Sequence, residues 1–231
     1  MKILGLIPAR AGSKGIPDKN RKELAGKPLL LYTIEAALAA NSLDRVVFSS
    51  EDETLRNMAE NAGVEVPFNR PTHLAEDHSG SLEVVQHALK ELSAQGSEYD
   101  AVCLLQVTTP FRTASDIDAA VSAFISAKTD SLISVQEVPH QYNPHWVFER
   151  NKDNSLQLAT GANSIIKRRQ DLPPAYIRDG AIYITKTSVL LEDNSFFGKS
   201  ISSIQLNPDT HVNIDTEEDW IWAEKIAASL K

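Results

Sequence analysis

The stretch Ile3-Leu4-Gly5-Leu6-Ile7-Pro8-Ala9-Arg10-Ala11-Gly12-Ser13-Lys14-Gly15 joins an apolar run to a basic loop that contains glycine. The run from Ile3 to Ile7 has no polar alternation, which is typical of a strand buried on both faces of a parallel sheet. The run ends at Pro8. This order predicts a buried first strand with a ligand-binding loop directly behind it.

Strand and helix patterns alternate along the chain on both sides of a polar interruption. Apolar runs predict strands at 45–50, 64–68, 101–105, 181–185 and 200–206. Helical spacing predicts helices at 28–41, 81–94, 115–127 and 217–230, and another that Asp52 caps and Gly63 stops. The alternation indicates βαβ crossovers and an open, mostly parallel sheet. Its ligand crevice lies beyond the carboxyl ends of the strands, where loops 8–27, 49–52, 76–81 and 106–112 converge.

The interruption lies at about residues 135–180. Four prolines punctuate this polar stretch, namely Pro139, Pro144, Pro173 and Pro174. We expect a single domain over 1–231 into which this segment is inserted, with a small sheet of its own.

Composition excludes several classes of function. The 231 residues have a net charge of -8 and no long basic stripe, so we expect no nucleic-acid partner. No apolar run approaches the roughly 18 residues of a membrane span, so we expect no membrane partner. Cys103 is the one cysteine, which excludes a disulfide framework and predicts a cytoplasmic location.

The loop after the first strand is dense in cations. Arg10, Lys14, Lys19, Arg21 and Lys22 face only Asp18 and Glu23. Gly12 and Gly15 let the backbone approach a ligand closely. The loop matches neither the Walker pattern nor the dinucleotide fingerprint. It favours a polyanion site, and a solvated basic turn is the alternative.

At this loop the sequence resembles the acylneuraminate cytidylyltransferases, or CMP-sialic acid synthetases. Their signature Ala-Arg-x-x-Ser-Lys-Gly-x-Pro-x-Lys-Asn is met from Ala9 to Asn20. The similarity continues through Arg70-Pro71, Leu74-Ala75, Leu104-Leu105-Gln106, Pro110-Phe111-Arg112, Gly180-Ala181-Ile182-Tyr183 and Ile214-Asp215-Thr216-Glu217. The resemblance implies a three-layer, Rossmann-like nucleotidyltransferase fold across the chain.

The resemblance also implies a reaction. The hydroxyl of a 2-keto-3-deoxy sugar acid attacks the α-phosphate of CTP, giving a CMP-sugar and pyrophosphate. Arg10 and Lys14 would neutralise charge on the phosphates, and with Asp215 they form the expected catalytic set. The expected nucleotide-binding residues are Ala9, Arg10, Ser13, Lys14, Asn20, Ser81 and Gln106. Gln106 has the donors and acceptors to read cytosine, and for Ser81 a helix N-cap is the alternative role.

Asn213 and Asp215 stand where the family usually has two aspartates that hold Mg²⁺. A neutral amide can still ligate magnesium, so both residues are expected metal ligands, with Asp215 the main one. Capping the last helix is the alternative for Asp215. A non-catalytic nucleotide-binding relative that lost metal competence at Asn213 is an alternative function.

On the sugar side, the resemblance implies binding by Arg169, Gln170, Asp179 and Tyr183. Arg169 matches an arginine that reaches the sugar acid across a dimer interface, so a homodimer with shared active sites is expected. A solvated charge run is the alternative for Lys167-Arg168-Arg169. Trp146 and Asp179 replace a lysine and an asparagine of the sialic acid enzymes. These departures leave related nonulosonic acids, and a KDO-type CMP-octulosonate synthetase, as alternatives.

Overall fold

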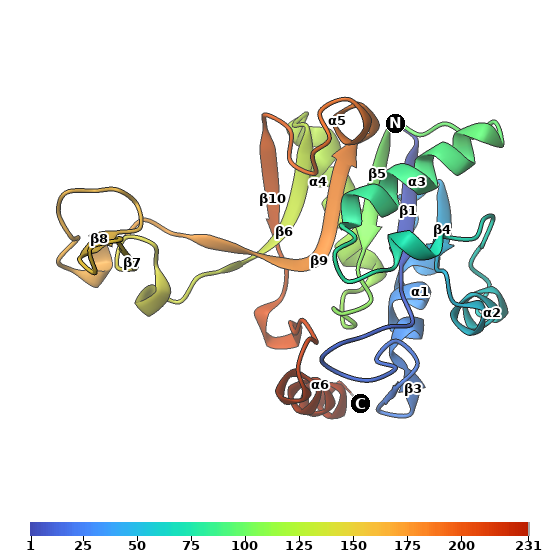
Figure 1. Cartoon of the computed structure of the whole chain (residues 1–231), viewed down its shortest axis with the longest axis horizontal. Helices are drawn as coiled ribbons and strands as arrows, with labels where there is room; N and C mark the ends of the chain where they lie inside the picture. Colours follow the sequence, from blue (N-terminus) through green and yellow to red (C-terminus); the bar gives the residue numbers. More distant parts are fainter. Residues whose placement is uncertain (231) are drawn as a thin grey trace. The chain divides into compact units, whose positions relative to one another are not determined.

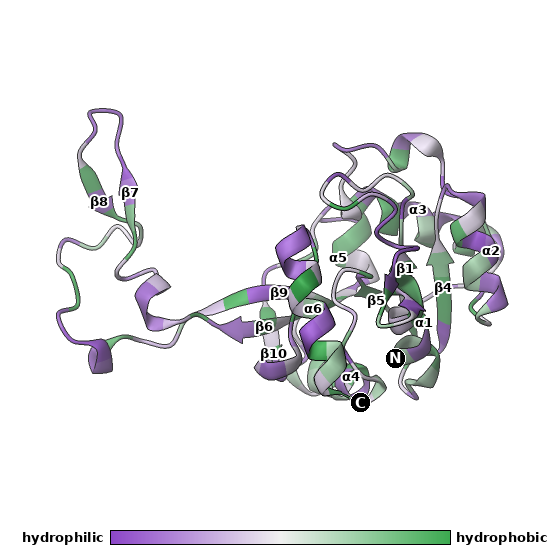
Figure 2. Cartoon of the chain, turned by 90° about the horizontal axis from the view of Figure 1, so that it is seen from below, coloured by the Kyte–Doolittle hydropathy of each residue, from purple (hydrophilic) through white to green (hydrophobic). Residues whose placement is uncertain are grey.

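The computed structural model describes residues 1–230, and its contacts divide the chain into two compact units. One unit comprises residues 1–134 together with the chain from Asp179 onward, and the other comprises Val135–Arg178. Figure 1 shows the elements of both units in sequence colours. Figure 2 shows the same chain coloured by the hydropathy of each residue.

The first unit is built on a six-stranded sheet. Its strand order is β10-β6-β9-β5-β1-β4. The strands are β1 (Ile3–Pro8), β4 (Arg45–Ser49), β5 (Ala101–Leu105), β6 (Ser131–Glu137), β9 (Tyr176–Lys186) and β10 (Ile201–Gln205). β1 pairs in parallel with β4 and β5, whereas β9 runs antiparallel to β5. The predicted open, mostly parallel sheet is confirmed.

Helices cover both faces of this sheet (Figure 1). The helices are α1 (Leu29–Ala39), α2 (Glu53–Asn61), α3 (Ser81–Ala94), α4 (Ala114–Ala127), α5 (Thr187–Leu191) and α6 (Glu217–Ser229). Ile3 and Ile7 pack with α1, α2, α4 and α6, while Leu4 and Leu6 pack with α3 and α5. The alternation follows from the period of two along a strand. β1 is buried on both faces, and the three-layer prediction is confirmed.

Helix ends follow local capping chemistry. Asp52 accepts from the backbone N–H of Leu55 at 2.8 Å, as predicted for the cap of α2. Thr113 forms a capping box with Asp116 at α4. The N-cap of α3 is Gly80, and Ser81 is the first helical residue, so the alternative role of Ser81 as a cap is wrong.

The predicted strand at 64–68 is wrong. Only one bridge forms there, between Val47 and Glu65 beside β4. Pro67 has no N–H to continue the ladder, and the chain turns away so that Arg70 donates its backbone N–H to Ser50. An apolar run alone does not specify strand pairing. The structure also contains a short unpredicted hairpin, β2 (Glu23–Leu24) with β3 (Lys27–Pro28).

The second unit, Val135–Arg178, has an antiparallel pair of its own, β7 (Phe148–Arg150) with β8 (Leu156–Leu158). Trp146 is half-buried, and its indole N–H donates to the carbonyl of Ile166 at 2.6 Å. Three-residue 3₁₀ turns at His140–Tyr142 and Arg169–Asp171 complete it.

No helix in residues 1–230 has the length and apolar character that crossing a membrane requires.

Candidate active site

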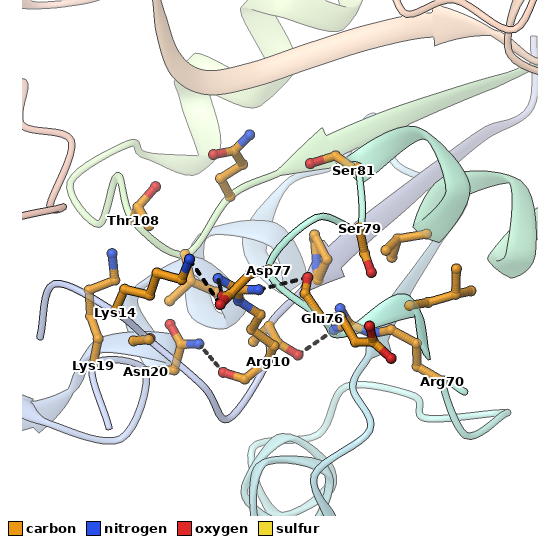
Figure 3. Close-up of a pocket in the computed structure, with 18 of the residues that line it drawn as sticks. Arg10, Lys14, Lys19, Asn20, Arg70, Glu76, Asp77, Ser79, Ser81 and Thr108 are labelled. Carbon is orange, nitrogen blue, oxygen red and sulfur yellow. Dashed lines mark hydrogen bonds and ion pairs between the residues drawn. The ribbon is translucent and has the colours of Figure 1, made fainter. Parts of the chain in front are cut away.

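A cavity of about 480 Å³ opens at the carboxyl ends of β1 and β5, within the usual range for small-molecule sites. Three parts of the chain form it: the loop after β1, the segment that leads into α3, and the turn after β5. Asp215, just before α6, completes the wall. Figure 3 shows the side chains that line it.

The loop after β1 is held in place by backbone hydrogen bonds to polar side chains. Asn20 donates its amide N–H to the carbonyl of Arg10 at 2.8 Å, and Glu51 accepts from the N–H of Ala11 at 2.8 Å. Arg70 donates to the carbonyls of Ala9 and Ser49. These contacts fix the loop backbone before any ligand arrives, which lowers the ordering cost of binding.

Gly15 lies against the segment before α6. An added Cβ there would lie 1.9 Å from the carbonyl oxygen of Asp215, so no side chain fits. At Gly12, by contrast, an added Cβ meets nothing within 4 Å. The sequence pattern predicted the same role for both glycines, but of the two only Gly15 is required by packing.

Two cations of the cavity share one carboxylate, Asp77 (Figure 3). The ion pairs are 3.2 Å long to Arg10 and 2.9 Å long to Lys14. Hydrogen bonding from Lys14 is the main cause that holds the pKa of Asp77 below its usual range, with the charges of Lys14 and Arg10 adding to it. Arg10 also donates to the carbonyl of Glu76 at 2.9 Å. An acidic side chain thus occupies the two cations expected to meet phosphate.

Arg70 contributes a buried cation behind the loop. Burial lowers the pKa of its guanidinium to about 10, which leaves it charged at neutral pH. Within residues 1–230, the Nε of Arg70 and the hydroxyl of Thr108 are buried without a hydrogen-bond partner. Buried polar atoms normally have partners, so both are available to a bound ligand or water.

Asp215 presents a carboxylate that is 63% exposed at the rim. Its Oδ1 lies 3.2 Å from the Nζ of Lys19, and its Oδ2 accepts from the amide of Asn213 at 2.9 Å. The cap of α6 is Thr216, in a capping box with Asp219, so the alternative role of Asp215 as that cap is wrong.

Oxygen donors near Asp215 determine whether magnesium fits this site. Across residues 1–230, no three His, Cys, Asp or Glu side chains gather into a metal cluster. Magnesium is commonly held by one or two carboxylates together with substrate phosphates and water. An exposed Asp215 beside a cavity lined by cations fits that mode, but not a cage made by the protein alone.

The structure brings the predicted nucleotide-binding residues together. All seven line the cavity, namely Ala9, Arg10, Ser13, Lys14, Asn20, Ser81 and Gln106. Four residues that were not among the expected site residues also line it, namely Lys19, Arg70, Asp77 and Thr108. Lys19 lies in the Ala9–Asn20 signature and Arg70 in the Arg70-Pro71 motif. Their positive charge within these motifs could have indicated a role in the site.

Asp179 and Tyr183, two of the predicted sugar-binding residues, do not line this cavity. Asp179 is buried, and it accepts from the hydroxyl of Ser134 and from the N–H of Ala181. Tyr183 is buried in the core layer that contains α3, with its ring beside Phe196. Arg169 and Gln170 are exposed in the unit 135–178, where Arg169 lines a separate hollow with His140 and Asn143.

Two solved structures share this fold. The chain is similar to CMP:2-keto-3-deoxy-manno-octonic acid synthetase complexed with CTP, at a TM-score of 0.73 and 15% identity, with 100% of both chains covered. It is also similar to 4-diphosphocytidyl-2C-methyl-D-erythritol synthase from Anaerococcus prevotii, at 0.65 and 12%, with 98% of each covered. At these identities the likeness concerns the fold, which is that of nucleotidyltransferases.

Sequence comparison then gives the family. The cytidylyltransferase family model matches residues 4–226. A pseudaminic acid cytidylyltransferase of Campylobacter jejuni is 35% identical, with 97% of this chain and 95% of the relative covered. A CMP-N,N'-diacetyllegionaminic acid synthase of Legionella pneumophila is 35% identical, with 98% and 96% covered. An N-acylneuraminate cytidylyltransferase of Streptococcus agalactiae is 32% identical over 96% of this chain, which spans 52% of that relative. The chain belongs to the cytidylyltransferase family and is a nucleotidyltransferase.

Proposed function

We propose that the chain transfers CMP from CTP to a nonulosonic acid, a nine-carbon 2-keto-3-deoxy sugar acid, and releases pyrophosphate. The observation that supports this most is the polyanion cavity, in which Arg10, Lys14, Lys19 and Arg70 gather at the carboxyl end of β1. The names of the full-length relatives above support the acceptor class. The octulosonate synthetase is a likeness of fold at 15% identity, which disfavours that alternative.

The transfer forms a bond between a sugar hydroxyl oxygen and the α-phosphorus and breaks the bond from that phosphorus to the bridging oxygen of pyrophosphate. The sugar hydroxyl gives its proton to water or to the departing pyrophosphate, on which negative charge gathers. Arg10 and Lys14 can stabilise that charge once Asp77 releases them. Cations that are already positioned for the transition state provide most of the rate enhancement in such reactions.

We assign nucleotide recognition to the opposite wall. Gln106 follows β5 directly, and its side-chain amide has no partner within residues 1–230. Ser81 at the start of α3 and the unpaired hydroxyl of Thr108 add further polar groups there. A base that matches these groups is preferred, since a mismatch leaves buried polar atoms unpaired.

We assign Mg²⁺ to Asp215, with the Asn213 amide holding that carboxylate or adding its oxygen. When bound, the ion would screen phosphate charge and polarise the α-phosphate. Because only one carboxylate is present at this pair of positions, the remaining ligands have to come from CTP and water.

Sugar binding is proposed at Arg169 and Gln170, whose exposed side chains suit a carboxylate. Asp179 and Tyr183 are buried in the structure, which favours support of the site over direct contact. We propose a homodimer in which the partner chain supplies Arg169. Several apolar residues of the inserted unit are exposed and suit such pairing, namely Val147, Phe148, Leu156, Ile165, Tyr176 and Ile177. The cytoplasm remains the proposed compartment, since it keeps the buried Cys103 thiol reduced.

The decisive experiment measures pyrophosphate release that depends on CTP and Mg²⁺ over a panel of acceptors. The panel contains pseudaminic, legionaminic and N-acetylneuraminic acids together with the eight-carbon octulosonic acid. Release with a nine-carbon acid, and faster with CTP than with UTP, is expected. Preference for the octulosonic acid would contradict the acceptor class, and no release with any acid would favour the non-catalytic alternative.

A further inference from the structure

Arg112 is a buried cation that the proposed reaction does not use. The residue is 6% exposed and follows the turn between β5 and α4. Burial has the largest effect on the pKa of its guanidinium, and the charges of Asp179 and Asp116 oppose that effect. Burial lowers its pKa to about 10, so the group is still charged at neutral pH. Burying a charge is costly, so the hydrogen bonds of Arg112 have to compensate for the lost hydration.

Those hydrogen bonds join three elements of the fold. The Nε of Arg112 donates to the carbonyl of Ala181 on β9 at 3.0 Å. Its Nη1 donates to the hydroxyl of Thr33 on α1 at 3.0 Å. Its Nη2 donates to the carbonyl of Gln106 and, at 2.6 Å, to the hydroxyl of Thr109. The planar fork of a guanidinium reaches these acceptors together, which an ammonium group cannot do.

The carbonyl of Gln106 is the point where these bonds meet. It accepts a hydrogen bond from the guanidinium of Arg112. It also accepts from the hydroxyl of Thr109 at 3.2 Å and from the hydroxyl of Thr33 at 3.5 Å. The backbone of Gln106 is therefore tied to the protein interior, while its side chain lines the cavity. The residues after Gln106 are held as well, because the backbone carbonyl of Thr108 accepts a hydrogen bond from the N–H of Ile214 at 2.8 Å.

We infer that Arg112 is a positioning residue for selection of the nucleotide base. Cytosine offers a donor at its amino group and an acceptor at N3, and uracil reverses both. A glutamine amide has a donor and an acceptor and can turn over to suit either base. Selectivity therefore requires that the surrounding turn stay fixed, so that uracil leaves polar groups unpaired. Arg112 supplies that rigidity, and this inference rests on the role proposed above for Gln106.

The test measures dissociation constants of CTP, UTP and inorganic pyrophosphate by calorimetry, without a sugar acceptor. The variants are Arg112→Met, which keeps bulk, Arg112→Lys, which keeps charge, and Thr109→Val, which removes one acceptor. Thr187→Val is the matched control. Thr187 is the first residue of α5, and its hydroxyl donates a hydrogen bond to the carbonyl of Tyr99 at 2.8 Å, which the change to valine removes.

Both Arg112 variants are expected to lower the preference for CTP over UTP, by about tenfold in Arg112→Met. Thr109→Val is expected to shift it in the same direction by less, and Thr187→Val not at all. Pyrophosphate binding stays within about twofold of wild type in all variants, because the phosphate loop is untouched. This separation distinguishes positioning of the base from general damage to the fold.

An unchanged CTP preference in folded Arg112→Lys and Thr109→Val would overturn the inference, even if Arg112→Met fails to fold. A parallel loss of pyrophosphate binding would overturn it too. Equal binding of CTP and UTP by the wild-type chain would instead contradict the proposed base recognition, and the inference would fall with it. If the wild-type chain prefers CTP over UTP and the variants keep that preference, the result contradicts only the role of Arg112.

Discussion

Asp77 holds the two cations that are expected to meet phosphate, so it competes with the ligand. Its carboxylate is 53% exposed, and pairs this exposed are individually weak. Asp77→Asn removes the competing charge and is expected to tighten binding of inorganic pyrophosphate by about two- to fivefold. Calorimetry at two salt concentrations measures this, and the gain should shrink at high salt.

A matched control for Asp77→Asn is Asp18→Asn. Asp18 pairs with Arg21 on the same loop but does not line the cavity. Its φ of 52° suits asparagine, which tolerates the left-handed region. We expect no change in pyrophosphate affinity there. Weaker binding by Asp77→Asn would mean that the carboxylate organises the cations instead of competing for them.

Asp215 and Asn213 together set the expected demand for magnesium. Asp215→Asn removes the one carboxylate of the pair and should raise the Mg²⁺ needed for half-maximal pyrophosphate release by at least about tenfold. Asn213→Asp places a second carboxylate beside the first and should lower that requirement. A titration of Mg²⁺ at saturating CTP measures both. A wild-type curve for Asp215→Asn would remove this residue from metal binding.

At the scale of elements, the loop after β1 and the segment before α6 meet at Gly15. Gly15→Ala forces the two apart, because the new Cβ would lie 1.9 Å from the carbonyl of Asp215. We expect loss of CTP binding and a lower Tm. Gly12→Ala is the matched control, since nothing lies within 4 Å of its added Cβ, and it should resemble wild type. Equal effects of the two changes would show that loop flexibility, not this contact, matters.

Asp130 ties the ends of three strands and makes folding sensitive to acid. Lys186, at the end of β9, lies 3.1 Å from its Oδ1, and the N–H of Lys199, just before β10, donates to Oδ2 at 3.0 Å. The hydrogen bond from Lys186, with those from Lys199 and Ser200, lowers the pKa of Asp130 from 3.8 to about 2. The unfolded chain thus binds more protons between these values. The stabilisation is complete above about pH 4 and is lost as pH falls to about 2.

Asp130→Asn tests this assignment. The variant should be less stable than wild type at neutral pH, because the ion pair with Lys186 is gone. Its Tm should then fall less than that of wild type as pH decreases from about 4 to about 2. Calorimetric scans over that range measure the difference. An equal fall in both proteins would show that other carboxylates control acid unfolding.

Patterns local in sequence were enough to predict most elements, whereas pairings distant in sequence were not. The strand at Ile3–Pro8 and the cap at Asp52 follow from neighbouring residues. The ion pairs of Asp77 with Arg10 and Lys14 depend on the folded path of the chain. The missing strand at 64–68 shows the same limit, because pairing needs a partner edge and free N–H groups, not only apolar side chains.

In the candidate site, too, some features could be predicted from local sequence and others depend on contacts between residues distant in sequence. The seven expected nucleotide-binding residues lie in one cavity because loops after parallel strands meet at one edge of the sheet. Burial of Asp179 and Tyr183 was not predictable from the resemblance, since it depends on partners such as Ser134 and Phe196. The bond network of Arg112 was likewise hidden, because its acceptors are mostly carbonyls and hydroxyls that any sequence contains.

At the scale of the whole molecule, the proposed homodimer predicts complementation. If Arg169 acts on the partner's site, mixing Arg169→Ala chains with Arg10→Ala chains gives a dimer with one intact site and one doubly defective site. Activity should return to a substantial fraction of wild type after subunit exchange. Pyrophosphate release measures it, together with sedimentation to confirm heterodimers.

The control for complementation mixes Lys14→Ala with Arg10→Ala chains. Both residues line the same cavity of one chain, so every site in the mixed dimer lacks one cation and stays impaired. Heterodimers of the Arg169→Ala mixture that remain as inactive as their parents would place Arg169 in its own chain's site or outside catalysis.

The contact of the first loop with Asp215 also bears on how the protein is made. Lys19 donates to the carbonyl of Ile214, which is 195 residues away, and Gly15 packs on the residue after it. A ribosome therefore exposes the basic loop long before the wall that closes it. Nascent chains and truncation products that stop short of Asp215 possess β1 and the cations but lack this wall of the cavity, so we expect them to bind CTP more weakly than the whole chain does.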